Sequence, residues 1–185
     1  MEEPIFASHQ LTKRYRDLAV DHITLEIKPG QIFGLVGKNG AGKTTLIRMI
    51  TGQTFPTSGD FTLFGQSGEA NLNKMRRRIG CMVETPSFFP YLSAQENLEF
   101  YRIQRGIPGR ETVNTLLRQV GLADTGKKKF KNFSLGMKQR LGLALALLGN
   151  PDFLALDGPI TGLGPVGIGE CRDGLLQLNR EHGTP

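Results

Sequence analysis

The chain has 185 residues, a length that allows one sizeable core. Its formal net charge of +6 suits binding to nucleic acid, an anionic membrane or a phosphate ligand. Its two cysteines, Cys81 and Cys171, lie far apart outside any CxxC pattern, which argues against a disulfide framework or a zinc site. No apolar run reaches the roughly 18 residues that span a bilayer, and the N-terminus lacks the features of a signal peptide, so neither a secreted nor a transmembrane chain is expected.

Strands are predicted for the first thirty-odd residues, because apolar and polar side chains alternate there, as in residues 23–28. Residues 32–36 (IFGLV) form a continuous apolar run, which predicts a strand buried on both faces. A helix is predicted over residues 43–50 and a short strand over residues 61–64. The early alternating strands favour a small antiparallel sheet.

The middle of the chain is predicted to be helical. A strand over residues 79–83 is followed by Ser93 and Glu96, whose spacing is typical of a capping box that begins a helix ending near residue 105. A second helix is predicted over residues 111–120.

Ser134 is the predicted N-cap of a strongly apolar helix that continues through residue 148. The basic run 127–131 before it is read as a solvated loop, with proximity to phosphate or membrane as the alternative. A buried strand is predicted over residues 153–156, ending at Asp157. Strands that alternate with buried helices indicate an α/β fold with a parallel sheet.

The sequence GKNGAGKT matches the phosphate-loop pattern GxxxxGK[ST] between a predicted strand and a predicted helix, the context that the motif requires. Glycines let backbone amides approach phosphate oxygens, and a helix N-terminus favours an anion; a purely structural turn is the alternative. Lys43 is expected to reach the β- and γ-phosphates, and Thr44 and Asp157 to hold Mg²⁺. The predicted nucleoside triphosphate site comprises Gly37, Lys38, Asn39, Gly40, Ala41, Gly42, Lys43, Thr44 and Thr45.

The order of these motifs over nearly the whole chain resembles the ATPase domain of an ABC transporter. Tyr15 lies where that family has an aromatic residue that stacks on adenine, and Glu84 lies where it has the Q-loop glutamine, an oxygen donor toward Mg²⁺ or water. The segment FSLGM lies where the family has its LSGGQ signature, which faces ATP bound by the opposite subunit. The resemblance assigns that contact to Ser134, Leu135, Gly136 and Met137, although an ordinary helix N-cap would use the same groups.

The resemblance implies a P-loop NTPase fold: a parallel sheet core, a small antiparallel β subdomain and a helical subdomain. Residues 1–185 are then a single ABC ATPase domain, in which residues 1–84 and 150–185 form the nucleotide-binding core and residues 85–149 the helical subdomain with the signature motif.

ATP and Mg²⁺ are the ligands that the resemblance implies. Its implied partners are a second ATPase subunit in a head-to-tail dimer and a transmembrane permease, which holds the chain on the cytoplasmic face of the membrane. Nucleic acid is not expected, because ABC ATPases that act on ribosomes or DNA normally carry a second cassette. The segment FSLGMKQRLG, together with Glu84, resembles the branch of the family that exports or confers immunity to bacitracin- and lantibiotic-type peptide antibiotics.

Two glycines depart from the family pattern. Gly158 stands where the family has the glutamate that polarises the attacking water, and Gly164 stands where it has a carboxylate that helps to join the two subunits. No intact catalytic residue is therefore expected, and ATP hydrolysis stays open. The chain also ends before the last core strand and the switch histidine that the resemblance predicts, which suggests a C-terminally truncated fold. Three hypotheses remain: the ATP-binding subunit of an exporter, a degenerate regulatory partner with little or no hydrolysis, and a truncated product with little function of its own.

Overall fold

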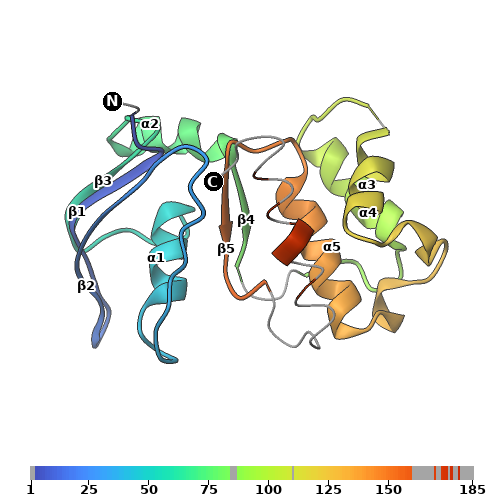
Figure 1. Cartoon of the computed structure of the whole chain (residues 1–185), viewed down its shortest axis with the longest axis horizontal. Coiled ribbons are helices and arrows are strands. Elements are labelled where there is room, and N and C mark those ends of the chain that lie inside the picture. The colour runs from blue at the N-terminus through green and yellow to red at the C-terminus, as the bar shows by residue number, and fades with distance from the viewer. Residues whose placement is uncertain are drawn as a thin grey trace.

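The computed structural model describes residues 3–83, 87–109 and 111–159, together with residues 169, 172–174, 176 and 179. Its elements form successive layers: an antiparallel sheet, helix α1 (Lys43–Ile50), two parallel strands and a group of helices (Figure 1). Two clusters of buried apolar side chains fill the space between these layers, one on each side of the parallel strands. The predicted α/β architecture is confirmed.

The antiparallel sheet consists of β1 (Phe6–Arg14), β2 (Leu18–Ile27) and β3 (Ser58–Leu63), with β1 in the centre. Phe6, Leu11 and Leu63 are fully buried beneath it, in the cluster to which α1 contributes its own buried side chains, Leu46, Met49 and Ile50. The predicted N-terminal strands and the small antiparallel sheet are therefore confirmed, although β3 begins earlier than the sequence indicates.

The two parallel strands, β4 (Ile79–Met82) and β5 (Phe153–Leu156), pair along their whole length. Successive side chains of a strand point to opposite faces. Phe153 accordingly joins the cluster beneath α1, whereas Leu154 and Leu156 pack against the helices on the other side. Because both faces are covered, β5 is apolar at every position, as the sequence predicts.

Three helices lie on the far side of the parallel strands: α5 (Leu135–Leu147) is next to the strands, and α3 (Ala94–Gln104) and α4 (Glu111–Gln119) lie beyond it (Figure 1). Each buries one or more apolar side chains in a common cluster, including Leu98, Val113 and Leu141. The three predicted helices are confirmed within a few residues at their ends. Among the described helices, none combines the length and apolar character that a membrane crossing requires.

The capping box at the start of α3 is also confirmed. The Ser93 hydroxyl accepts from the Glu96 amide at 3.2 Å, and the Glu96 carboxylate accepts from the Ser93 amide at 2.6 Å. Lys129 adds an ion pair to the same carboxylate at 3.2 Å. These groups, the Ser93 amide first, lower the pKa of Glu96 to about 2.

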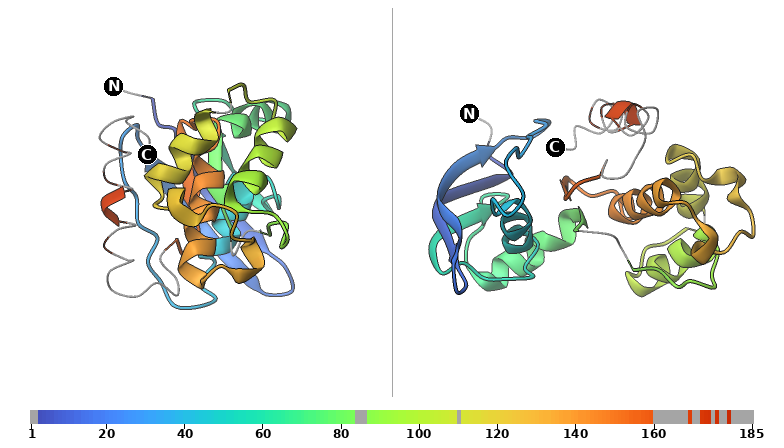
Figure 2. Two further views of the ribbon diagram at one scale, coloured as in Figure 1. Left: turned by 90° about the vertical axis from the view of Figure 1, so that its right-hand side faces the viewer. Right: turned by 90° about the horizontal axis from the view of Figure 1, so that it is seen from below.

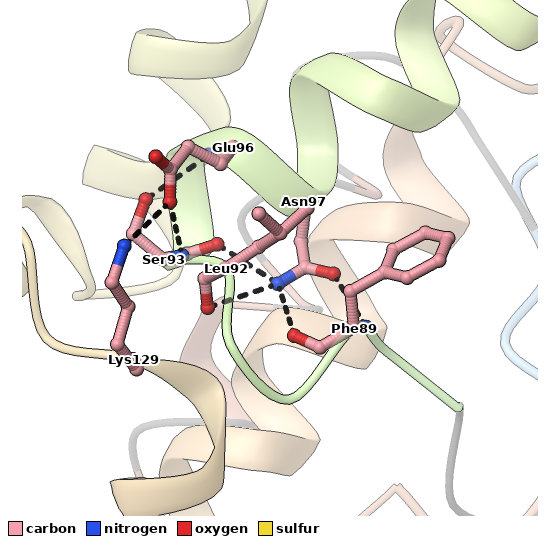
Figure 3. A network of polar contacts seen from close by, with 6 residues as sticks. All are labelled: Phe89, Leu92, Ser93, Glu96, Asn97 and Lys129. Atoms are coloured by element: carbon pink, nitrogen blue, oxygen red, sulfur yellow. Dashed lines mark hydrogen bonds and ion pairs between the residues drawn. The ribbon is translucent and has the colours of Figure 1, made fainter.

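A buried amide fixes the loop that precedes α3 (Figure 3). Asn97 is fully buried, and its side-chain nitrogen donates to the carbonyl oxygens of Ser93, Phe89 and Leu92 at 2.9, 3.2 and 3.3 Å. Its side-chain oxygen accepts from the Phe89 amide at 2.8 Å. The polar groups of Asn97 are thus paired in a site that water does not reach.

Several short helices complete the described chain. Helix α2 (Glu69–Met75) is not evident from the sequence, because its core-facing side consists only of Leu72 and the partly buried Met75, a pattern too short to indicate a helix. The others are 3₁₀ helices at Arg76–Arg78, Ala123–Thr125 and Phe130–Asn132.

The prediction of a buried strand over residues 32–36 is wrong. These residues have no regular secondary structure, and their side chains are exposed: Ile32 is 57% exposed and Val36 is 99% exposed. An apolar run forms a strand only where a neighbouring strand pairs with its backbone. Within the described ranges β5 pairs with β4 alone, so the segment runs past α1 without a strand partner (Figure 1).

Candidate nucleotide-binding site

The phosphate loop, residues 37–44, leads from the exposed segment into helix α1. Gly40 and Gly42 have φ values of +82° and +86°, in the left-handed region that other residues rarely adopt. A Cβ atom on Gly42 would lie 2.0 Å from the carbonyl oxygen of Ala19, at the start of β2. Position 42 therefore requires glycine both for its conformation and for its contact with β2.

The N-terminus of α1 is suited to an anion. Gly42 is its N-cap, so no side chain caps the helix, and no acidic residue lies in its first turn. The first amides of a helix have no intrahelical acceptor, and the helix dipole adds partial positive charge there. The Lys43 ammonium donates to the carbonyl oxygens of Gly37 at 2.7 Å and Lys38 at 2.8 Å, which holds it inside the loop. The loop thus combines the donors and the charge that a phosphate group needs.

Thr44 and Asp157 meet across the fold although they are 113 residues apart in sequence. The Thr44 hydroxyl donates to Oδ2 of Asp157 at 2.5 Å. The Asp157 amide donates to the carbonyl oxygen of Met82 at 2.7 Å, which fixes Asp157 at the carboxyl end of the parallel strands. Two residues that the sequence assigns to one magnesium site are therefore in direct contact.

This oxygen pair suits Mg²⁺ only in company with a phosphate ligand. Among the described residues there is no cluster of three or more His, Cys, Asp or Glu side chains that could hold a metal by themselves. Proteins usually bind Mg²⁺ through one or two carboxylates together with substrate phosphates, and a phosphate loop beside one carboxylate fits that pattern. Glu84, the other predicted oxygen donor, lies outside the described residues, as does Gly164.

Gly158 follows Asp157 directly and has a φ of +59°. Placing a residue with a side chain in this left-handed conformation costs roughly 1–2 kcal/mol of conformational free energy. The position therefore lacks a carboxylate and also has a backbone conformation that disfavours glutamate. Sequence reasoning misses this second point, because a glycine does not reveal which conformation it adopts.

Tyr15 lies in the bend of residues 15–17 between β1 and β2, and its side chain is 53% exposed. Its hydroxyl donates to the Thr54 hydroxyl at 3.4 Å, and the Lys13 ammonium lies 4.8 Å from its ring centroid. The bend is followed by Ala19, whose carbonyl oxygen lies against Gly42 of the phosphate loop. The exposed aromatic ring and the loop are therefore carried by segments in contact.

The signature residues form a separate group. Ser134 is the N-cap of α5, and its hydroxyl accepts from the Met137 amide at 3.3 Å. Leu135 is exposed, and no acidic residue lies in the first turn of α5. Helix α5 lies on the opposite side of the parallel strands from α1 (Figure 1 and the right-hand view of Figure 2). Ser134 to Met137 therefore do not form one site with the phosphate loop of the same chain.

Comparison with known proteins gives consistent matches. Residues 20–161 match the sequence profile of the ABC transporter family. The bacitracin transport ATP-binding protein BcrA of Enterococcus faecalis is 42% identical over 183 residues, which are 98% of this chain and 59% of that protein. The lantibiotic transport ATP-binding protein SrtF of Streptococcus pyogenes is 38% identical over 162 residues, which are 88% of this chain and 69% of that protein. The chain thus spans a little under three fifths of the length of its bacitracin relative.

Solved structures agree with the sequence matches. The dimeric structure of MJ0796, a bacterial ABC transporter cassette, has a TM-score of 0.87 at 26% identity and covers 97% of this chain and 84% of that one. The same cassette bound to ADP and phosphate has a TM-score of 0.84 at 26% identity, with coverage of 97% and 84%. The phosphate loop, its contact with Asp157, the family profile and these relatives agree, and the chain belongs to the ABC transporter family as an ATP-binding domain.

Proposed function

We propose that the chain is the ATP-binding subunit of an ABC transporter and that it binds MgATP at the phosphate loop. The hydrogen bond between Thr44 and Asp157 is the observation that carries this proposal. It brings the carboxylate of Asp157 to the first turn of α1, beside the loop where the β- and γ-phosphates of a bound nucleotide would lie.

Each part of the site has a role in this proposal. The amides at the start of α1 and the Lys43 ammonium bind phosphate oxygens, and Tyr15 stacks on the base. Thr44 and Asp157 would hold Mg²⁺, with Glu84 as a further oxygen donor. When bound, the ion neutralises charge on the β- and γ-phosphates. Gly158 supplies no group to orient the attacking water.

A second ATPase subunit completes the proposed site. The amides and hydroxyl at the start of α5, from Ser134 to Met137, contact ATP held by the opposite subunit of a head-to-tail dimer. In each subunit, residues 1–84 and 150–185 form the nucleotide-binding core and residues 85–149 the helical subdomain. A transmembrane permease holds the dimer on the cytoplasmic face of the membrane.

The transported substrate is proposed to be a peptide antibiotic. Support comes from the relatives, since BcrA is a bacitracin transport ATP-binding protein and SrtF a lantibiotic transport ATP-binding protein. The alternatives of a degenerate regulatory subunit and of a fragment without function receive no support from these relatives, which are described as transport ATP-binding proteins.

Calorimetric titration of the purified chain with ATP tests the nucleotide site, with Lys43→Ala as the binding-deficient variant and Lys28→Ala as a matched control for charge. We expect ATP binding by the chain and the control and its loss in Lys43→Ala. Equal binding by Lys43→Ala would exclude the phosphate loop as the site. Bacitracin tolerance of cells that express the chain with its permease tests the substrate class, and tolerance that is unchanged by Lys43→Ala would argue against it.

A further inference from the structure

The bend that carries Tyr15 is tied to residues 54–57, a segment that follows α1. The Thr57 amide donates to the carbonyl oxygen of Thr12 at 2.8 Å. The Arg14 amide donates to the Thr57 hydroxyl at 3.0 Å, and that hydroxyl lies 3.3 Å from the carbonyl oxygen of Arg14. The end of β1 is therefore fixed to this segment by backbone and side-chain contacts.

Lys13 connects the same segment to the ring of Tyr15. Its ammonium donates to the carbonyl oxygen of Phe55 at 2.8 Å and lies 4.8 Å from the centroid of the Tyr15 ring. A cation at this distance is attracted by the negative face of an aromatic ring. One face of the ring is thus occupied by a cation that is itself held in place, while Tyr15 as a whole stays 53% exposed.

The segment also joins the ring to the helix of the phosphate loop. The amides of Gln53 and Thr54 donate to the carbonyl oxygen of Arg48, in the last turn of α1, at 2.8 and 3.2 Å. Helix α1 begins at Lys43 in the loop itself. Tyr15 is consequently held relative to the phosphate loop from two sides, through residues 54–57 and through the contact of Ala19 with Gly42.

We infer that Lys13 is a positioning residue for base recognition: it holds the exposed Tyr15 ring in the orientation in which its other face stacks on the base of the nucleotide. This inference rests on the proposed function, because it requires nucleotide binding with the base at Tyr15. Besides the cation of Lys13, the Tyr15 side chain has a long hydrogen bond from its hydroxyl to Thr54 at 3.4 Å, at the end of the ring that lies away from the backbone.

The expected effect of Lys13 on ATP affinity comes from the ordering of the Tyr15 side chain before the nucleotide binds. Immobilising a mobile side chain on binding weakens affinity by about 2- to 13-fold, and a ring that is already oriented avoids this loss. Lys13→Met removes the charge and keeps an unbranched stem of similar length. We expect it to weaken ATP binding within that range. Lys13→Arg keeps a cation that stacks on aromatic faces and should restore the affinity.

The experiment compares two ligands that share the phosphates but differ in the base. Dissociation constants for MgATP and for magnesium tripolyphosphate are measured by calorimetry, directly or by competition, for the unaltered chain, Lys13→Met, Lys13→Arg and the control Lys28→Met. We expect Lys13→Met to weaken binding of ATP alone, with recovery in Lys13→Arg and no change in Lys28→Met. In a Tyr15→Ala background, Lys13→Met should have no further effect.

Three results would overturn the inference: unchanged ATP affinity in Lys13→Met, an equal loss for both ligands, or an undiminished effect of Lys13→Met in the Tyr15→Ala background. The second would mean that Lys13 acts on the phosphates, and the third that it contacts the base itself. Failure of the unaltered chain to bind ATP would instead overturn the proposed function, and the inference with it.

Discussion

The contact between Gly42 and strand β2 predicts how the phosphate loop responds to a single methyl group. In Gly42→Ala the new Cβ would lie 2.0 Å from the carbonyl oxygen of Ala19 and 3.1 Å from Cγ2 of Val20. Ordinary contact begins at 3.4 Å, so the loop has to move. The left-handed conformation costs about 1–2 kcal/mol and overpacking about 1–3 kcal/mol, so we expect the free energy of unfolding to fall by about 2–5 kcal/mol.

Gly40→Ala is the matched control for this experiment. Gly40 has a similar φ of +82°, but nothing lies within 4 Å of a Cβ placed there. Its substitution should therefore cost only the conformational part, about 1–2 kcal/mol. Urea denaturation of both variants measures the difference, and calorimetric titration should show weaker ATP binding by Gly42→Ala because its loop is displaced. Equal losses of stability in the two variants would refute the reasoning, because contact with Ala19 would then play no part.

Three further predictions concern the helical layer and Gly158. Asn97→Ala should lower the free energy of unfolding by about 1–3 kcal/mol, because it removes a fully buried amide and leaves the backbone groups that it pairs, including the partly buried amide of Phe89, without that partner. The exposed control Asn114→Ala should change it by about 0.5 kcal/mol or less, and equal effects in denaturation would contradict the role of the network. Gly158→Glu should release phosphate from ATP about 10²- to 10⁴-fold faster than Gly158→Gln, which has the same backbone strain without a carboxylate, and equal rates would argue against a missing water-activating group. Because the pKa of Glu96 falls from 4.5 to about 2 on folding, its contribution to stability is present above about pH 4.5 and is lost as the pH falls toward 2. The stability advantage over Glu96→Gln, measured by denaturation, should shrink from pH 6 to pH 3, and a constant advantage would contradict this assignment.

Strand β5 and residues 32–36 show what an apolar run does and does not predict. Both runs are continuous and apolar, yet β5 is paired and covered on both faces, whereas residues 32–36 are exposed. The pattern indicates a segment that is stable when buried, but it contains no information on which backbone lies beside it. Helix α2 illustrates the reverse case, because only Leu72 and the partly buried Met75 face the core, which is too short a pattern to indicate a helix.

The candidate site likewise has features that the sequence predicts and features that it does not. The phosphate loop and Asp157 could be predicted because their chemistry requires particular residues at a particular spacing, and their 2.5 Å contact agrees with that. Two other features could not be predicted: the contact of Gly42 with Ala19 and the left-handed conformation of Gly158. Both depend on the path of the backbone, which a glycine in a sequence does not reveal. The contact of Lys13 with Tyr15 could not be predicted either, because β1 ends at Arg14 and Tyr15 lies in the bend that follows, so the period of a strand does not place its ring.

The magnesium dependence of ATP binding tests the central claim most directly, namely that the phosphate loop and Asp157 form one MgATP site. ATP is titrated into the unaltered chain and into Asp157→Asn, each with and without Mg²⁺, and urea denaturation verifies that the variant is folded. We expect Mg²⁺ to strengthen ATP binding by the unaltered chain and to have little effect on Asp157→Asn, which keeps the phosphate loop but not the carboxylate. An equal effect of Mg²⁺ on both proteins, or no ATP binding by the unaltered chain, would contradict it.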